Sequence, residues 1–288
     1  MLKLSAAPLL GFFLSLASCA GTGLRGAPYV IIDTKSGEGL EFEEFINRLD
    51  DADVIFLGEE HDNTTCHELQ HWTTVALAKR REVTLSLEQF EVDVQGTLDA
   101  YLEGQITEAA FLSKSRPWNN YEEHYRPTVE WARENGRPVI AANIPRPLAR
   151  KVSRGEGQTL SVQGNEHAPW QLNTDDPAYR ARFAEAMGLH GDTEKEDLDD
   201  WFAAQCIKDE RMAESIANSI KKTDLHTPLV VHWCGRFHSD YRLGTVSRLS
   251  ERRPDLNIIT VSMKTSDELS LTLSEEASSS ADFVWKIR

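Results

Sequence analysis

Two segments of this chain share a layout in which a short apolar run is followed by Gly-x-x-His. The first motif begins at Gly58 and ends at His61, and the second begins at Gly235 and ends at His238. Short apolar runs bounded by glycine are typical of buried strands. Ligands of open α/β sheets bind beyond the carboxyl ends of such strands, so two imidazoles at that position predict a metal or catalytic site.

The Gly-x-x-His spacing is not specific by itself. With 17 glycines and 9 histidines in 288 residues, chance alone gives about 0.5 matches per chain. A third match begins at Gly164 and ends at His167, but no apolar run precedes it, and we interpret it as a polar loop. The prediction of a site therefore depends on the strands and on what else follows them.

Residues able to do chemistry follow four of the predicted strands. They are Glu59, Glu60 and His61; Glu88 and Gln89; Asn143 and Arg146; and Arg236, His238 and Asp240. The carboxyl ends of parallel strands meet at one edge of a sheet, so we expect these side chains to share a functional rim. The alternative is that they are ordinary polar residues of loops.

Two histidines and a carboxylate at one edge suit a divalent metal, and the predicted ligands are His61, Glu88 and His238. Imidazole and carboxylate together can hold zinc, manganese or iron, and the sequence does not choose among them. A metal with an open coordination position would activate water for hydrolysis. In a hydrolase of this kind Glu60, Glu88 and Arg236 are the candidate catalytic residues, and Arg236 and Arg146 could stabilise developing negative charge.

The segment from His67 to His71 matches the His-Glu-x-x-His signature of zinc proteases, which places both histidines on one helical face. The apolar residues of this helix, such as Leu69 and Trp72, point roughly opposite to that face. We therefore expect His67 and His71 to face outward, where they could contact a large flat ligand but not form a buried zinc site.

Aromatic residues cluster at positions 118–131. Aromatic side chains at helical spacing most often pack in a core. Tyrosine and histidine are also ligands of haem iron, so Tyr121 and Tyr125 are candidates for cofactor binding together with His67 and His71.

Residues 1–18 have the features of a cleaved secretory signal: Lys3, an apolar stretch too short to span a bilayer, and small residues before Cys19. Small residues directly before a cysteine resemble the cleavage site of bacterial lipoproteins. The resemblance implies that Cys19 is lipidated, and Ala20 after it implies the outer membrane. The alternative is an ordinary signal peptide with an incidental cysteine.

The net charge of −15 argues against nucleic acid or anionic membranes as partners. We expect a lipidated N-terminus and tether at 19–40, one α/β domain at 41–270, and an acidic and serine-rich C-terminal tail at 271–288. Within that tail we expect residues 275–282 to be mobile. Three further cysteines could form one disulfide with one free thiol, or remain three buried thiols. They are Cys66, Cys206 and Cys234.

Short apolar runs alternate with helical patterns along the domain. Strands are predicted at 53–57, 83–88, 138–143, 229–233 and 257–263. Helices are predicted at 64–81, 92–102, 107–114, 121–135, 147–154, 179–187, 197–222 and 241–251. The alternation predicts an α/β fold, with a mostly parallel central sheet flanked by helices on both faces, additional helices and an irregular insertion at 155–177.

Several motifs taken together resemble the ChaN family of bacterial haem-binding lipoproteins, over roughly residues 45–263. They are 58–63 with His67 and Gln70, 87–90 with Gln95 and Tyr101, 141–146, 208–213 and 235–241. The resemblance implies an α/β fold and the binding of haem or a related iron porphyrin in iron uptake, with a homodimer around the haem as one arrangement.

The wider group, which includes the Tiki and TraB proteins, is similar in having two Gly-x-x-His motifs and an acidic residue that are proposed to form a metal-hydrolase site. A metal-dependent, peptidase-like hydrolase is therefore the alternative function. A surface scaffold with an inactive site is a third.

Overall fold

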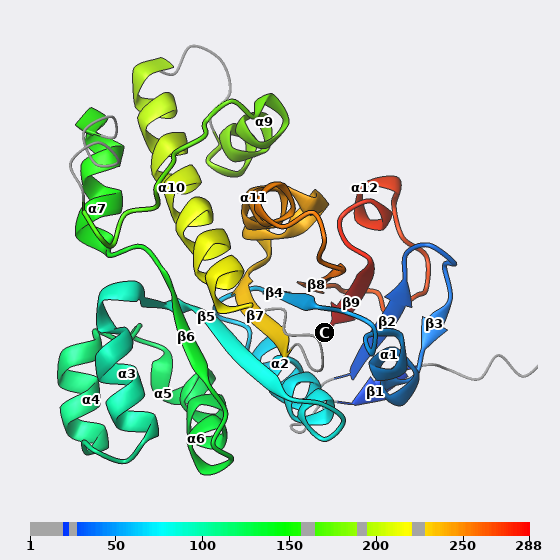
Figure 1. Cartoon of the computed structure of the whole chain (residues 1–288). Coiled ribbons are helices and arrows are strands. Elements are labelled where there is room, and N and C mark those ends of the chain that lie inside the picture. Colours follow the sequence, from blue (N-terminus) through cyan, green and yellow to red (C-terminus); the bar gives the residue numbers. More distant parts are fainter. Residues whose placement is uncertain (1–19, 23–27, 157–164, 189–194, 221–227) are drawn as a thin grey trace, which may run out of the picture.

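The computed structural model describes residues 20–22, 28–156, 165–188, 195–220 and 228–288 (Figure 1). The predicted signal segment, Cys19 and part of the predicted insertion lie outside these ranges. Within them, no helix is both long enough and apolar enough to cross a membrane.

Nine strands of the described residues form one sheet. Their order is β1 (Ala20–Thr22), β2 (Pro28–Asp33), β9 (Phe283–Ile287), β8 (Ile258–Thr265), β4 (Val54–Glu59), β7 (Leu229–Gly235), β5 (Val83–Glu91) and β6 (Val139–Asn143), and β3 (Gly39–Leu40) pairs with β2. The strands from β9 to β6 are parallel, whereas β1, β2 and β3 add antiparallel pairs at one edge. The predicted α/β class with a mostly parallel sheet is confirmed.

The central strands are β4 and β7, and every residue of both is buried. They pair in register, with Ile55 opposite Val231. A parallel strand covered on both faces needs apolar side chains on both, which explains why these segments read as continuous apolar runs. The five strands predicted from such runs are β4, β5, β6, β7 and β8.

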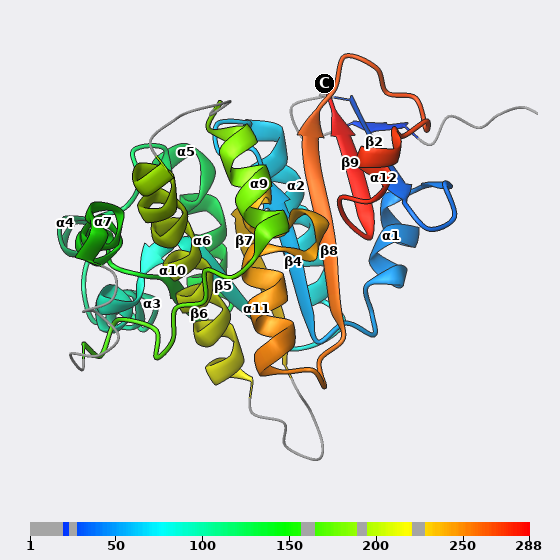
Figure 2. The same ribbon diagram turned by 90° about the horizontal axis from the view of Figure 1, so that it is seen from above.

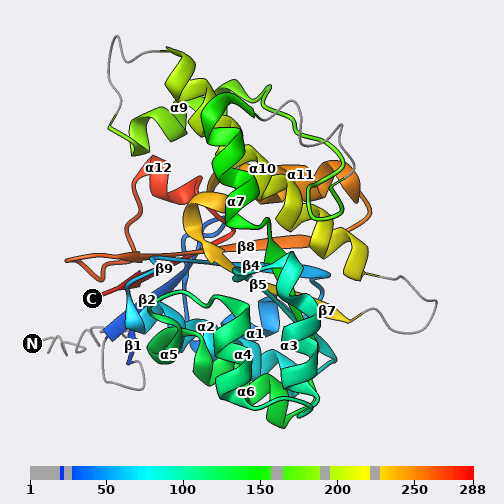
Figure 3. The same ribbon diagram turned by 90° about the vertical axis from the view of Figure 1, so that its left-hand side faces the viewer.

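Helices cover both faces of the sheet, as Figure 3 shows. One face carries α1 (Phe42–Arg48), α2 (Thr64–Ala78), α3 (Gln95–Leu102), α4 (Glu108–Ser115), α5 (Tyr121–His124) and α6 (Arg126–Glu134). The other carries α7 (Arg146–Lys151), α9 (Pro177–Ala186), α10 (Lys195–Ser219), α11 (Gly244–Arg252) and α12 (Glu275–Ser278). Separate apolar cores fill the two interfaces: Phe45 and Leu69 belong to the first, and Ile216 and Val246 to the second.

The order of the strands places the predicted site near the middle of the sheet, where the carboxyl ends of β4 and β7 lie side by side. After β4 the chain crosses through α2 to β5, which is not next to β4 in the sheet. The place between them is taken by β7, which follows α10 on the opposite face. Such a change of direction opens a crevice at the carboxyl ends of the strands. In Figure 2 the arrowheads of β8 and β9 mark this edge of the sheet, and α9 lies on the same side.

Two boundaries expected from the sequence are wrong. Residues 28–40 are not part of a tether, because β2 and β3 belong to the sheet and Ile31 and Ile32 are fully buried. Residues 283–287 are not a tail outside the domain, because β9 pairs with both β2 and β8 and buries Trp285. Both strands are short apolar runs, and the pairing between them joins segments that are distant in the sequence.

Within the predicted insertion, the described residues 165–176 contain neither helix nor strand, whereas 155–156 end a short π-helix and α9 begins at Pro177. His167 lies within 165–176, so the third Gly-x-x-His match ends in a loop as predicted. Cys66, Cys206 and Cys234 are free and buried, which excludes a disulfide among them.

Candidate functional site

The two Gly-x-x-His motifs pack against each other at the carboxyl ends of β4 and β7. A Cβ atom on Gly58 would lie 2.7 Å from Ser239 Oγ and 2.9 Å from Arg236 Cα, and Gly235 borders the ring of His61 in the same way. Neither glycine has room for a side chain, so glycine allows the two turns to approach closely.

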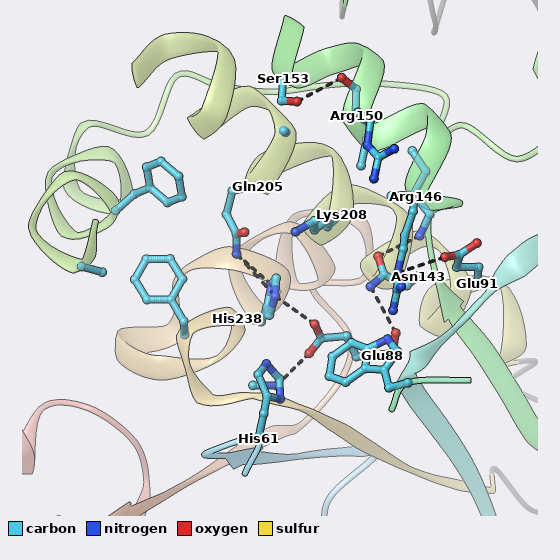
Figure 4. Close-up of a pocket in the computed structure, with 18 of the residues that line it drawn as sticks. His61, Glu88, Glu91, Asn143, Arg146, Arg150, Ser153, Gln205, Lys208 and His238 are labelled. Atoms are coloured by element: carbon cyan, nitrogen blue, oxygen red, sulfur yellow. Dashed lines mark hydrogen bonds and ion pairs between the residues drawn. The ribbon is translucent and has the colours of Figure 1, made fainter. Parts of the chain in front are cut away.

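His61, Glu88 and His238 line one cavity of about 630 Å³, which lies between the edge of the sheet and α7, α9 and α10 (Figure 4). A cavity of this size is in the range of small-molecule and cofactor sites. Strand order thus brings the three predicted metal ligands together. Glu60 and Arg236 do not line this cavity, and Arg236 instead pairs with Asp240 at 2.9 Å.

His61 is held by Glu59, which the sequence analysis placed at the rim but not among the metal, catalytic or cofactor-binding residues. Its Nδ1 donates to Glu59 Oε1 at 2.8 Å, and its side chain is 42% exposed whereas that of Glu59 is fully buried. Burial alone would raise the pKa of Glu59, but the charge and hydrogen bonds of His67 and His61 outweigh it and hold that pKa well below its usual range. Glu59 is therefore ionised and holds the ring of His61 by Nδ1. Burial lowers the pKa of His61, but Glu59 and the nearby Glu88 raise it.

His67 carries a positive charge beneath the site. Its Nε2 lies 2.9 Å from the carbonyl oxygen of His61, and its Nδ1 lies 3.1 Å from Gln70 Oε1 and 3.3 Å from Glu59 Oε2. All three partners are acceptors, because Gln70 uses its amide nitrogen to bond Leu57. Both ring nitrogens must then donate, and Glu59 raises the pKa of His67 although burial opposes this.

His238 lies between two carboxylates. Its Nδ1 is 2.7 Å from Asp209 Oδ1, and its Nε2 is 3.3 Å from Glu88 Oε1. Burial lowers the pKa of His238, but the two carboxylates raise it to about 10. Burial would likewise raise the pKa of Glu88, yet His238 and the backbone N–H of Gly235 lower it to about 2.

The expected outward face of His67 and His71 is wrong. His67 is 3% exposed and stacks on His124 of α5, with ring centroids 4.3 Å apart. His71 is half-buried and bonds Thr128 Oγ1 at 2.7 Å. Helical periodicity correctly places the apolar residues of α2, but α5 and α6 cover the remaining face, which the sequence of α2 could not reveal.

The two candidate tyrosines also lie in the core. Tyr121 is 3% exposed and packs against Phe90 and Phe111, and Tyr125 is fully buried. Neither lines the cavity. The aromatic cluster at 118–131 is thus mainly core, with Trp118 as the member that reaches the cavity, 4.9 Å from the His61 ring.

The wall opposite His61 is cationic and apolar. Arg146, Arg150 and Lys208 line it, together with Phe183 and Met187. Arg146 lies 3.5 Å from Glu91, whereas Arg150 and Lys208 have no ion-pair partner among the described residues. This wall suits a ligand with an apolar body and acidic groups.

The metal prediction finds less support in the geometry. Among the described residues, no group of three or more His, Cys, Asp or Glu side chains is placed to hold a metal ion. His61, Glu88 and His238 share the cavity, but Glu88 pairs with His238.

Two carboxylates that fix the histidines were not predicted as site residues. Glu59 follows the apolar run of β4 directly, so its position at the rim was visible, but its burial was not. Asp209 comes from α10 and reaches His238 across the fold, with Thr245 and Tyr179 donating to it. Asp209 belongs to the 208–213 motif of the family resemblance, but nothing in the helical pattern indicates that it reaches His238.

Comparison with known proteins identifies a matching family and solved structures of similar fold. A family model described as "Haem-binding uptake, Tiki superfamily, ChaN" matches residues 45–249. ChaN of Campylobacter jejuni, solved with cofacial haem binding, is similar over 90% of this chain and 97% of its own, with 20% identity and a TM-score of 0.69. Two other solved structures are less similar. A Bacillus cereus protein has 12% identity and a TM-score of 0.45 over 77% of this chain and 68% of its own. An erythromycin esterase mutant has 11% identity and a TM-score of 0.46 over 82% of this chain and 77% of its own. No curated protein sequence matches significantly.

Proposed function

Since the chain belongs to the ChaN family of haem-binding uptake proteins in the Tiki superfamily, we propose that it binds haem or a related iron porphyrin in the cavity beyond β4, β5 and β7. One observation carries the assignment of the site: His61 projects a half-exposed imidazole into the cavity while a buried carboxylate holds its Nδ1. Histidines that bind metals typically donate their other nitrogen in this way.

His61 is the best-placed axial ligand. Haem iron is commonly held by histidine or tyrosine. Five of the six tyrosines are buried, and the sixth, Tyr241, lies in another cavity and bonds Glu276. His238 lines the cavity but has both nitrogens directed at carboxylates. The Nε2 atom of His61 is thus the one that would take the iron.

The charges of the site favour a cation at His61. Three buried carboxylates, Glu59, Glu88 and Asp209, meet two doubly donating imidazoles, His67 and His238. One negative charge is left over if His61 is neutral, and the raised pKa of His61 reflects this excess, which either a proton or a metal cation at His61 would offset. Ferric iron in a porphyrin core carries one positive charge, and at Nε2 of His61 it would neutralise the site.

The walls fit the rest of the ligand. The porphyrin ring needs apolar contacts, which Trp118, Phe183 and Met187 can supply. Its propionates need donors, and Arg150 and Lys208 are cations without an ion-pair partner among the described residues. The cavity therefore offers an axial ligand, an apolar wall and a cationic wall.

We also propose a homodimer. Cofacial haem binding in ChaN of Campylobacter jejuni suggests two sites that face each other. Here the side chain of Met187, which lines the cavity, is 50% exposed. Trp201 is 37% exposed, and it lies on α10 one helical turn before Gln205, which also lines the cavity. Two exposed apolar side chains beside one cavity suit a contact between subunits. We further propose that Cys19 is lipidated and anchors the protein in the outer membrane, on the basis of the N-terminal sequence. A role in iron acquisition is proposed on the basis of the family.

Titration of purified protein with hemin, followed by visible absorption, tests the proposed function. We expect saturable binding with one hemin per chain, and the His61→Ala variant should lose the wild-type spectrum and bind at least about tenfold more weakly. His167→Ala, which removes a histidine of the 165–176 loop outside the cavity, is the control. A wild-type spectrum from His61→Ala would reject His61 as the ligand, and no saturable binding by wild type would reject the function. Sedimentation with and without hemin tests the dimer.

A metal-dependent hydrolase is the second candidate. It is favoured by the carboxylate on Nδ1 of each histidine, Glu59 on His61 and Asp209 on His238, because metal-binding histidines typically donate their other nitrogen to such a group. A metal ion would have to replace the pairing of Glu88 with His238. Calorimetric titration of haem-free protein with Zn²⁺ and with Mn²⁺ tests it: binding that His238→Ala abolishes supports this candidate, and its absence rejects it.

A further inference from the structure

Arg116 ends α4 in a backbone conformation that an arginine rarely adopts. Its φ and ψ are both 50°, in the left-handed region, where the residue after a helix is most often glycine. A residue with a Cβ atom is strained there, and such strain persists only where the surroundings compensate for it. The contacts of the Arg116 side chain therefore indicate what an arginine provides at this position.

The guanidinium of Arg116 contacts two carboxylates at the end of β5. Its Nη2 atom lies 2.7 Å from Glu91 Oε2, and 2.6 and 2.8 Å from the two oxygens of Asp93. Glu91 is buried and lines the cavity, whereas Arg116 is half-exposed and does not line it. Arg116 thus contacts a residue of the cavity wall from behind.

An irregularity of β5 places Glu91 in that wall. Leu87 pairs with Ala141 of β6, and the next pair joins Glu91 to Asn143, which is four residues further along β5 but only two along β6. Extra residues of this kind redirect side chains next to functional sites. Here they bring Glu91 beside Asn143 and Arg146, which also line the cavity (Figure 4).

Glu91 has a second cationic partner. Arg146 Nε lies 3.5 Å from Glu91 Oε1, and the Arg146 side chain is 61% exposed. This contact is longer than the 2.7 Å bond from Arg116, so Arg116 is the main partner of Glu91 and Arg146 is only loosely held. Among the described residues, no other cation lies within ion-pair distance of Glu91.

We propose that Arg116 is a positioning residue for Arg146. A buried carboxylate needs a cationic partner, and Arg116 supplies it. The guanidinium of Arg146 is thereby available to acidic groups of a ligand, such as the propionates of the porphyrin in the function proposed above, on which the inference rests. Without Arg116, Arg146 would close on Glu91, and the cavity would lose one of the cations of its wall.

Arg116→Gly is the main test, because glycine favours the backbone conformation of this position and the variant removes the guanidinium without adding strain. At low salt we expect the affinity for hemin to fall about three- to fivefold, as for the loss of one partly exposed charge pair. The affinity for the dimethyl ester of hemin should stay unchanged. Trp118, two residues further along, also lines the cavity, but its displacement would weaken the binding of both ligands equally.

The opposite change is made at Glu91. Glu91→Gln removes the charge that Arg116 and Arg146 share, so hemin should bind more tightly. In the double variant the loss caused by Arg116→Gly should disappear, which a double-mutant cycle measures. Lys114→Ala is the control: it removes one exposed positive charge from the same end of α4, does not touch the cavity wall, and should bind hemin as wild type does.

A second measurement needs no ligand. Phenylglyoxal labels accessible guanidinium groups, and mass spectrometry of the peptides compares the labelling of individual arginines. In ligand-free Arg116→Gly we expect Arg146 to be labelled more slowly than in wild type, because it would be bound to Glu91. Arg150, which is exposed one turn later on α7, should be labelled at an unchanged rate.

The inference is overturned if Arg116→Gly binds hemin as wild type does, or if it loses as much affinity for the ester as for hemin, and hemin binding itself would still stand. Failure of the proposed function looks different, because wild type would then show no saturable hemin binding. The labelling would still decide in that case: slower labelling of Arg146 in Arg116→Gly supports its positioning by Arg116, and equal labelling overturns it.

Discussion

The ring of His61 occupies the space that a side chain at Gly235 would need: a Cβ atom there would lie 2.7 Å from Cε1 and 2.8 Å from Nε2. The glycine of one Gly-x-x-His motif thus makes room for the histidine of the other. The two motifs form one unit, held by the register of β4 and β7.

Gly235→Ala should therefore displace the His61 imidazole. We expect hemin affinity to fall by about tenfold or more and the ligand spectrum to change, because the added methyl group cannot fit without moving the ring, and overpacking of this kind costs roughly 1–3 kcal/mol. Hemin titration followed by visible absorption measures both effects.

Gly96→Ala serves as the control for that substitution. Nothing lies within 4 Å of a Cβ placed on Gly96, which is in α3, and alanine is favoured over glycine in helices. It should bind hemin as wild type does and unfold at an equal or higher temperature. Unchanged hemin binding by Gly235→Ala would show that His61 can move aside without consequence.

Lys208→Ala tests whether the cationic wall receives the propionates. A partly exposed charge pair contributes up to about 1 kcal/mol, so we expect hemin affinity to fall about three- to fivefold at low salt. The variant and wild type should bind the dimethyl ester of hemin equally, because the ester carries no charge to recognise. Lys151→Ala, which removes a charge on α7 that does not line the cavity, is the control. An equal loss with the ester would assign Lys208 a packing role.

Cys19→Ser tests the proposed anchor. Without the thiol, acylation cannot occur, and the protein should be recovered as soluble or unprocessed material in cell fractions washed with high salt. Ser18→Ala keeps a small residue before the cysteine and should remain in the outer membrane. Retention of the Cys19→Ser protein in that membrane would contradict the lipoprotein proposal.

The sequence predicts the central sheet well because its strands are buried on both faces. Burial on both faces demands an uninterrupted apolar run such as 54–57 or 229–231, and such a run is visible without knowledge of its neighbours. β2 and β9 pair with each other from opposite ends of the domain, so nothing local distinguishes Tyr29–Ile32 or Phe283–Trp285 from short apolar runs in loops.

The site is predictable only in part for a similar reason. The histidines stand at the ends of recognisable strands, and parallel strands end at one edge, so His61 and His238 could be placed together. The burial of Tyr125 and His67 depends on how α5 and α6 pack over α2, which is a tertiary property. The sequence therefore indicated the edge of the sheet at which the site lies. It wrongly offered His67, Tyr121 and Tyr125 as cofactor-binding residues, because these side chains are buried and do not line the cavity.

The charge of His67 gives the stability of the protein a pH dependence of defined sign. The pKa of His67 is raised in the folded protein, against about 6.5 in the unfolded chain. A raised pKa means that the folded state holds the proton more tightly, so this stabilisation is complete below pH ~6.5 and is lost as the pH rises through the folded pKa. The free-energy difference between wild type and His67→Gln should thus be largest near pH 6 and shrink in alkaline solution.

His71 provides a control of opposite sign on the same helix. Burial lowers the pKa of His71, so the unfolded chain takes up the proton more readily and wild type loses stability as the pH falls below ~6.5. The difference between wild type and His71→Gln should therefore shrink toward acid. Denaturant unfolding of the three haem-free proteins between pH 5 and 9 measures both trends. A parallel response of the two variants would show that His67 carries no charge in the folded protein, and the charge balance proposed for the haem site would then fail.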